Sequence, residues 1–142
     1  MNLPVEKKGS YVRGMFNRIA PHYELMNRLM TGGQDVRLRR EVIHRAQLAP
    51  HSRLLDVGAG TGDLAREALR QQPDCSVVAA DFTPGMMRIG RQHSPPALNW
   101  SAADALALPF PDAHFDAVVS GYLLRNVSNL PQALREQYRV LK

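Results

Sequence analysis

The chain has 142 residues, a length typical of a single domain, and 44% of them are hydrophobic, so a packed core can form. Its one cysteine, Cys75, excludes an internal disulfide, and a reducing cytoplasm is the expected location. The first ten residues lack the apolar centre of a signal peptide, and the apolar runs are too short to span a bilayer.

The net charge of +5 is concentrated in the first third of the chain. Residues 1–45 contain nine basic and four acidic residues, whereas residues 46–142 contain nine of each. A solvated basic face is the ordinary interpretation. A surface that contacts an anionic partner is the functional one, and lipid headgroups, an acidic protein or nucleic acid would each fit.

Helical periodicity dominates residues 1–48, which we expect to form a helical cap and a lid over the substrate. Pro21 and the pair Gly32 and Gly33 interrupt this pattern. The three helices predicted on either side of these breaks cover residues 11–19, 23–30 and 35–47.

Strands alternate with helices after Pro50, which is typical of a doubly wound parallel sheet. The predicted strands are residues 53–57, 75–81, 97–104 and 115–120, and the predicted helices are residues 63–72, one that Thr83 and Pro84 open, and residues 130–140. The fold class is therefore α/β, with a Rossmann-like core over residues 49–142. In such sheets, ligands bind at the carboxyl ends of the strands.

Three glycines follow the first predicted strand in "LLDVGAGTGD", residues 54–63. Gly58 and Gly60 match the dinucleotide pattern G-x-G-x-x-G, but Asp63 occupies its third glycine position. A pyrophosphate at the helix N-terminus is disfavoured beside that acid. Asp56 or Asp63 would suit an ammonium group instead, while backbone N–H groups bind a carboxylate. The loop thus favours a zwitterionic amino acid joined to a nucleoside.

Acidic residues also follow the next two predicted strands. Asp81 ends the second strand, about 20 residues beyond the loop, where a carboxylate can accept hydrogen bonds from both ribose hydroxyls. Asp104 follows the third strand and, with Ala105, is placed to meet an adenine edge. A glycine loop alone can be an ordinary tight turn, but the turn does not explain these acids.

This combination resembles the class I S-adenosylmethionine-dependent methyltransferases. Three stretches narrow the resemblance to the ubiquinone/menaquinone biosynthesis C-methyltransferase family: "MFNRIAPHYELMNRLMTGG", "LLDVGAGTGDLA" and "ADALALPFPDAHFDAVVSGYLLRNVSNLPQALREQYRVLK", which includes the distinctive "LRNV". The similarity runs from about Val12 to the last residue. It implies S-adenosylmethionine as cofactor, contacted by Thr61, Asp81, Asp104, Ala105 and Ser120, with Gly58 and Gly60 shaping the loop. We add Asp56 to this set.

The resemblance also implies the reaction, methylation of demethylmenaquinol or a related polyprenyl benzoquinol. It assigns Arg125, Asn126 and Tyr23 to the reacting quinol. Arg125 would stabilise a phenolate or act through an ordered water, because a guanidinium does not readily give up its proton. No metal site is expected, since the five histidines are scattered. In this chain Glu24 replaces an expected aspartate, and Leu38 replaces a common tryptophan.

The same resemblance suggests partners. A polyprenyl tail needs an apolar groove, which the methionine-rich N-terminal stripes would offer unless they are ordinary core, and the basic excess would hold it against an anionic membrane face. The family usually continues with a Pro-Gly-Gly turn and three more strands in the order 3-2-1-4-5-7-6. A truncated form is therefore expected, with the fourth strand as an exposed edge that invites a homodimer or a segment swap.

Two other interpretations stay open: a class I methyltransferase for another small apolar molecule, and a truncated module that binds S-adenosylmethionine, or only self-associates, without turnover. An NAD-dependent oxidoreductase is disfavoured because the third dinucleotide glycine is absent. A nucleic-acid methyltransferase is disfavoured because no Asn-Pro-Pro-Tyr-type loop follows the fourth strand and aromatic residues make up only 6% of the chain.

Overall fold

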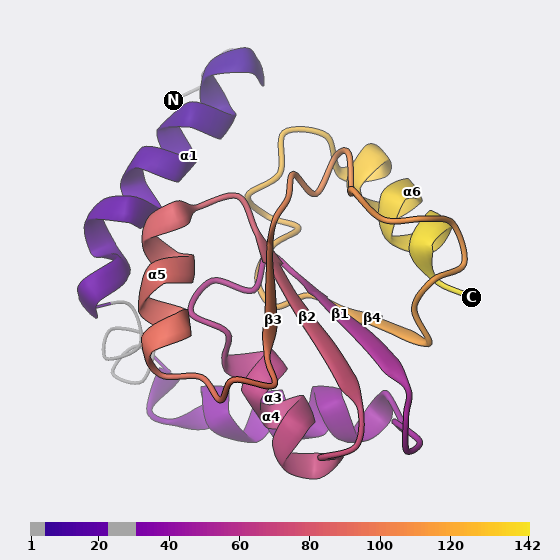
Figure 1. The fold of residues 1–142 in the computed structure, drawn as a ribbon. Helices are drawn as coiled ribbons and strands as arrows, with labels where there is room; N and C mark the ends of the chain where they lie inside the picture. Colours follow the sequence, from indigo (N-terminus) through magenta and orange to yellow (C-terminus); the bar gives the residue numbers. More distant parts are fainter. Residues whose placement is uncertain (1–4, 23–30) are drawn as a thin grey trace.

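The structure is a computed structural model, and it describes residues 5–22 and 31–142 (Figure 1). Its centre is a parallel sheet of four strands in the order β3-β2-β1-β4, which confirms the predicted class. The strands are β1 (Arg53–Val57), β2 (Ser76–Asp81), β3 (Asn99–Ala102) and β4 (Ala117–Val119).

The register aligns the carboxyl ends of the strands at one edge of the sheet. Asp56 of β1 lies between Ala79 of β2 and Val119 of β4, and Asp81 of β2 pairs with Ala102 of β3. All four strands run in one direction, so the loops that follow them meet at this edge. The site is therefore expected there.

Helices cover both faces of the sheet. The helix α4 (Asp63–Gln71) contributes to one apolar cluster and α6 (Leu130–Val140) to another. In Figure 1, α4 lies below the sheet and α6 above it to the right. Neighbouring residues of β1 divide between the clusters, Leu54 facing that of α4 and Leu55 that of α6. This alternation explains why the neighbouring residues Leu54 and Leu55 are both apolar although they face opposite sides of the sheet.

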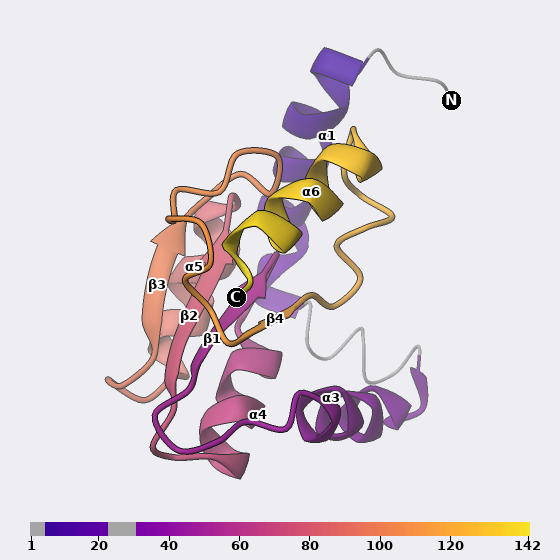
Figure 2. The same cartoon turned by 90° about the vertical axis from the view of Figure 1, so that its right-hand side faces the viewer.

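The helix α3 (Gln34–Arg45) packs against α4, and both views show the two together at the bottom of the molecule (Figures 1 and 2). It begins after Gly32 and Gly33, whose positive φ angles of 59° and 82° do not fit a helix. The interruption of the helical pattern therefore lies where the sequence predicted it. The contact joins the predicted cap to the core.

The helix α1 (Val5–Ile19) packs against α5 (Pro84–Gln92), the helix that follows β2. The amide of Gly85 donates to the side-chain oxygen of Asn17 at 2.9 Å. After α1, a short 3₁₀ turn, η1 (Ala20–His22), contains Pro21, in agreement with the predicted interruption. The predicted helix over residues 23–30 lies outside the described residues. Within the described residues, no helix has the length and apolar character needed to cross a membrane.

The third and fourth strands are shorter than predicted. β3 ends before Asp104, whose side chain accepts the amide of Leu106 at 2.8 Å and turns the chain. Phe115, predicted to start the fourth strand, bridges to Leu141 instead of β1. Among the described strands, β4 pairs with β1 alone, which agrees with its expected place at the edge of the sheet.

Candidate functional site

Two cavities open beside the glycine loop, residues 58–62, at the carboxyl edge of the sheet. Their volumes are about 330 Å³ and about 270 Å³. Gly58, Gly60, Gly121 and Tyr122 line both of them. Together they are in the size range of ligand pockets, and these shared walls allow one ligand to extend through both.

The glycine loop is pressed between two large side chains, which explains the residue type at two of its positions. Gly58 has a φ of 69°, and a Cβ atom there would lie 2.7 Å from Cδ1 of Leu123. Gly62 has a φ of 86°, and a Cβ atom there would lie 2.8 Å from the Trp100 ring. Any side chain at either position would clash or strain the backbone. The loop can therefore lie close to a ligand.

The amides of the loop are largely used within the protein. Those of Gly58 and Ala59 donate to the carbonyl of Ala80 at 2.8 and 3.0 Å. The amide of Gly60 donates to Oδ2 of Asp81 at 2.8 Å. We expected backbone N–H groups of this loop to bind a ligand carboxylate. That expectation is wrong for these three amides, because each already has an acceptor.

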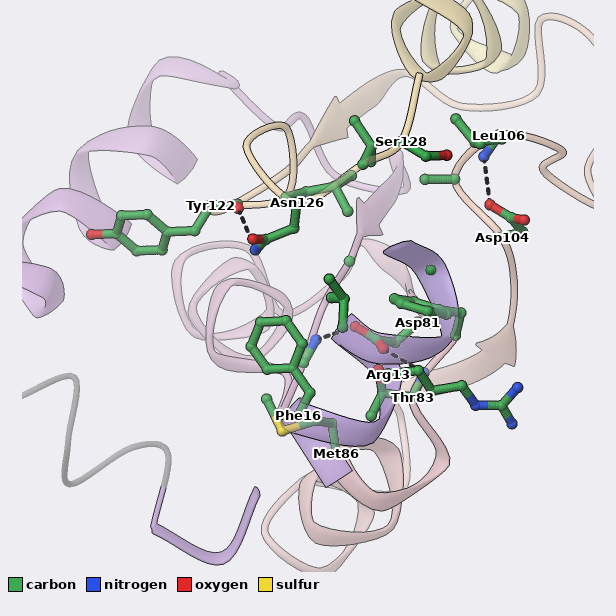
Figure 3. Close-up of a pocket in the computed structure, with 18 of the residues that line it drawn as sticks. Arg13, Phe16, Asp81, Thr83, Met86, Asp104, Leu106, Tyr122, Asn126 and Ser128 are labelled. Atoms are coloured by element: carbon green, nitrogen blue, oxygen red, sulfur yellow. Dashed lines mark hydrogen bonds between the residues drawn. The ribbon is translucent and has the colours of Figure 1, made fainter. Parts of the chain in front are cut away.

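Asp81 is buried at the end of β2 and faces the first cavity (Figure 3). Its Oδ1 accepts the amide of Thr83 at 2.7 Å, while its Oδ2 accepts that of Gly60. Burial raises the pKa of this carboxyl, and hydrogen bonding from Gly60, Thr83 and Phe82 opposes that shift. A carboxylate has about four lone-pair sites, so Asp81 can accept further hydrogen bonds from a ligand.

Asp104 and Ala105 lie on the same cavity, beyond the end of β3. Asp104 is exposed, whereas Ala105 is buried against the core of α6. Figure 3 shows Phe16 of α1 and Asn126 on opposite sides of the cavity. Its apolar lining comes from both the cap and the core, from Val12, Phe16, Phe82, Met86 and Leu123. The first cavity thus combines an apolar lining with acidic groups at one side.

The second cavity contains two buried polar atoms without a partner. Asp56 Oδ2 and Thr61 Oγ1 make no hydrogen bond within the described part of the chain, although both residues are nearly inaccessible, at 1% and 2%. Burial, together with the nearby charge of Asp81, raises the pKa of Asp56 to about 7. Unpartnered buried groups are costly, so a ligand that donates hydrogen bonds here would be favoured. An ammonium group fits this pair.

Asp63 is not open to a ligand in the same way. Its Oδ2 lies 2.9 Å from Nη2 of Arg39, and its Oδ1 lies 2.5 Å from Nη2 of Arg66. Asp63 also lies in the first turn of α4, where the unpaired helix amides stabilise a negative charge. Of the two acids considered for an ammonium group, Asp56 is therefore the one that fits.

The loop after β4 carries the remaining predicted residues. Ser120 lines the second cavity and Asn126 lines the first. The Asn126 side chain donates to the carbonyl of Tyr122 at 3.2 Å. Arg125 is exposed and lines neither cavity, and its guanidinium carbon lies 5.0 Å from the centre of the Tyr122 ring. Tyr23 lies outside the described residues.

Sequence reasoning missed Tyr122. This residue lines both cavities, is 48% exposed and has a φ of 59°, which is unusual for a bulky side chain. Strained backbone of this kind often occurs at functional sites. Its position, two residues after Ser120 at the end of a predicted strand, was the signal that could have identified it.

A comparison with protein families identifies the chain. The family model described as the ubiE/COQ5 methyltransferase family matches residues 4–142. The chain belongs to the ubiE/COQ5 methyltransferase family. The resemblance inferred from the sequence motifs is thereby confirmed.

Curated relatives carry names from this family. A demethylmenaquinone methyltransferase from Thermus thermophilus is 45% identical over 89% of this chain and 59% of its own length. One from Symbiobacterium thermophilum is 40% identical over 96% of this chain and 57% of its own length. A ubiquinone/menaquinone biosynthesis C-methyltransferase UbiE from Desulfotalea psychrophila is 42% identical over 97% of this chain and 56% of its own length. The present ubiE/COQ5 chain thus spans less than two thirds of the length of these relatives.

Solved structures show that the fold is shared more widely than the family. A SAM-dependent methyltransferase from Thermotoga maritima aligns with a TM-score of 0.69 at 22% identity, over 91% of this chain and 56% of that one. The [4+2]-cyclase SpnF aligns with a TM-score of 0.67 at 33% identity, over 75% of this chain and 41% of that one. The fold of the ubiE/COQ5 chain therefore does not by itself fix a reaction.

Proposed function

We propose that this chain binds S-adenosylmethionine across the two cavities and transfers its methyl group to a ring carbon of a quinol, demethylmenaquinol or a polyprenyl benzoquinol. The observation that carries the proposal is the pair Asp56 and Asp81. Asp81 ends β2, Asp56 is the last but one residue of the adjacent β1, and each lines a different cavity beside the shared glycine loop. An ammonium group and a ribose are the two parts of the cofactor that need such acids.

The first cavity has the chemistry for the adenosine part. Asp81 offers free acceptor sites for ribose hydroxyls, as a carboxylate at the end of a second strand does in related sheets. Asp104 and Ala105 lie beyond β3 and would meet the adenine edge. Phe82 and Met86 supply apolar contacts for a flat ring. We assign these residues to the adenosine.

The second cavity has the chemistry for the amino-acid part. Asp56 and Thr61 would accept hydrogen bonds from the ammonium group, which satisfies two buried atoms at once. Ser120 lies on the same cavity and offers a hydroxyl. When bound, S-adenosylmethionine supplies an electrophilic methyl group, and the residues of this chain orient it between the cavities.

The rim of the second cavity offers an apolar surface for the acceptor. Leu38, Val42 and Tyr122 line this cavity, and their side chains are exposed. Large apolar side chains beside an open cavity favour a ligand that covers them. A quinol ring with a polyprenyl tail has that character. With Leu38 in place of a tryptophan, the only aromatic contact of these three comes from Tyr122.

Arg125 and Asn126 are our candidates for the chemistry of the acceptor ring. A ring carbon becomes a better nucleophile when a neighbouring hydroxyl, with a phenolic pKa of about 10, loses its proton. Arg125 stacks on Tyr122, so its positive charge lies near the apolar rim and would favour the phenolate. The guanidinium stays protonated, and the proton would leave through water. Tyr23 stays a prediction for the same ring.

We further propose that residues 1–48 act as a cap held at an anionic membrane face in the cytoplasm, while residues 49–142 form the binding core. Helices α1 and α3 each line one cavity, which supports the role of a cap. Exposed Arg37, Arg40 and Arg45 on α3 support contact with anionic headgroups. Flotation with vesicles of phosphatidylglycerol at low salt, and no flotation with phosphatidylcholine, is the expected result.

A homodimer through β4 belongs to the same proposal. This strand pairs with β1 alone among the described strands, and an edge of this kind can pair with a second chain. Light scattering at micromolar concentration is expected to give twice the mass of one chain. A monomer mass across the concentration range would contradict it.

Calorimetry and mass spectrometry test the main proposal in two steps. S-adenosylhomocysteine should bind with a measurable heat, and absence of heat at high concentration would rule out the cofactor. Demethylmenaquinol incubated with the protein and S-adenosylmethionine should then gain one methyl group. Binding without product would leave the chain as a binding module.

A further inference from the structure

Arg39 gives the second cavity its positive charge. Among the described residues that line this cavity, it is the one cationic side chain, beside the acids Asp35, Asp56 and Asp63. Its side chain is 19% exposed and belongs to α3, so the cap rather than the sheet supplies it. Neither the loop motif nor the resemblance assigned it a role.

Two acids orient the Arg39 guanidinium through a single nitrogen. Nη2 lies 2.7 Å from Oδ2 of the buried Asp35 and 2.9 Å from Oδ2 of Asp63. Within the described part of the chain, both ion pairs use this atom, and neither uses Nε or Nη1. The N–H groups of Nε and Nη1 can therefore donate to another acceptor, and a guanidinium forms short, charge-assisted hydrogen bonds with a carboxylate.

A bound amino acid would need such a partner in this cavity. Its ammonium group has acceptors in Asp56 and Thr61, but its carboxylate has few donors. The amides of Gly58 and Ala59 already donate to Ala80. An unpaired carboxylate in a partly closed cavity is costly, so a cation must compensate it.

We propose that Arg39 binds the carboxylate at the amino-acid end of S-adenosylmethionine, a step that rests on the cofactor binding proposed above. The ammonium group then faces Asp56 on the core side, and the carboxylate faces Arg39 on the cap side. In this arrangement Arg39 and Arg66 together neutralise Asp35 and Asp63, the ammonium group pairs with Asp56, and the ligand carboxylate lies beside the positive charge of Arg39. Cofactor binding thereby links α3 to the glycine loop.

A comparison of two ligands separates this contact from the rest of the site. S-adenosylhomocysteine and its decarboxylated analogue differ in the carboxylate alone, and both keep the ammonium group. The wild-type chain should bind the decarboxylated analogue about 10- to 100-fold more weakly, as expected for the loss of a charge-assisted pair. Affinities can be followed by calorimetry or by the fluorescence of Trp100, whose ring lies against the loop at Gly62.

Variants then assign the difference to Arg39. In Arg39→Gln, the affinity for S-adenosylhomocysteine should fall about 10- to 100-fold, while that for the decarboxylated analogue stays unchanged. Arg39→Lys should retain part of the preference for the ligand with a carboxylate, because the positive charge remains although the planar set of guanidinium donors is lost. Arg88→Gln removes an exposed arginine on α5 that lines neither cavity, and it should behave like the wild type. Asp35→Asn with Arg39→Gln removes both charges and provides a second folded variant if the single change unfolds.

Two results would overturn the assignment of Arg39. One is a wild-type chain that binds both ligands equally. The other is an Arg39→Gln variant that weakens both ligands by the same factor, since this would show that Arg39 only holds α3 in place. If the wild type binds neither ligand, the cofactor proposal fails and this one fails with it, which is a different outcome from either.

Discussion

The carboxylate of Asp81 accepts the amide of Gly60 across 2.8 Å, which ties the end of β2 to the turn that follows β1. The same carboxylate faces the first cavity. One side chain therefore both shapes the glycine loop and offers acceptors to a ligand. Substitutions of Asp81 will affect both roles, and the choice of variant can separate them.

Asp81→Ala removes both roles and is expected to abolish measurable binding of S-adenosylhomocysteine. Asp81→Asn keeps an oxygen for one amide and should lose about 10-fold in affinity, because a neutral acceptor replaces a charged one. Calorimetry measures both. Asp74→Ala, an exposed acid near the opposite end of β2, is the matched control and should bind as the wild type does. Full binding by Asp81→Ala would remove this residue from the site.

Gly58→Ala is expected to destabilise the fold by about 1–3 kcal/mol, because the backbone there has a φ of 69° and the new methyl group would overlap Leu123. Urea denaturation followed by circular dichroism measures the change. Combining it with Leu123→Ala should recover part of the loss, since the overlapping atoms are then gone. Gly14→Ala on α1 meets no atom within 4 Å and should not destabilise. Equal stability of both single variants would contradict the close packing at Gly58.

Ligand affinity should depend on pH through Asp56. Its pKa is raised to about 7, so it is partly protonated at neutral pH and a protonated carboxyl pairs poorly with an ammonium group. The affinity for S-adenosylhomocysteine is expected to increase from pH 6 to pH 7.5, with release of a proton on binding. Calorimetry in buffers of different ionisation enthalpy detects that proton. Asp56→Asn should bind more weakly and show a flat profile, and an unchanged slope in this variant would exclude Asp56 as the group responsible.

The same carboxyl should make the free protein less stable as pH rises. Its folded-state pKa of about 7 exceeds the ordinary value of 3.8, so between these values the folded protein holds a proton that the unfolded chain has lost. The contribution to stability is full below pH 4 and decreases until about pH 7. The Asp56→Asn variant has no carboxyl group here and so does not lose stability in this pH range. Its melting temperature should exceed that of the wild type at pH 8 but not at pH 4. An equal difference at both pH values would contradict this origin.

Arg125→Ala should separate binding from turnover. Arg125 lines neither cavity, so the affinity for S-adenosylhomocysteine is expected to stay within about twofold of the wild type. Product formation from demethylmenaquinol, followed by mass spectrometry, should fall at least about 100-fold because the phenolate loses its positive neighbour. Arg135→Ala on the exposed part of α6 serves as the control. Normal product formation in Arg125→Ala would make our assignment wrong.

Much of the core followed from local pattern. The strand β1 (residues 53–57) and the helix α6 (residues 130–140) each have the predicted bounds. Apolar periodicity, and the proline in the first turn of α6, specify them without reference to distant residues. The ends of β3 and β4 could not be read this way. A side-chain turn at Asp104 and a pairing of Phe115 with Leu141 decide them, and the second joins residues 26 positions apart.

By itself, the sequence determined the order of strands and helices, the family, and the acids at the ends of the first three strands. These features depend on spacing along the chain, which a motif records directly. Only the tertiary structure decided how those groups are used: Asp63 is ion-paired to Arg39 and Arg66 while Asp56 stays open, and the loop amides are already occupied. These differences arise from burial and from contacts between the cap and the core, which join residues distant in sequence and so leave no local pattern.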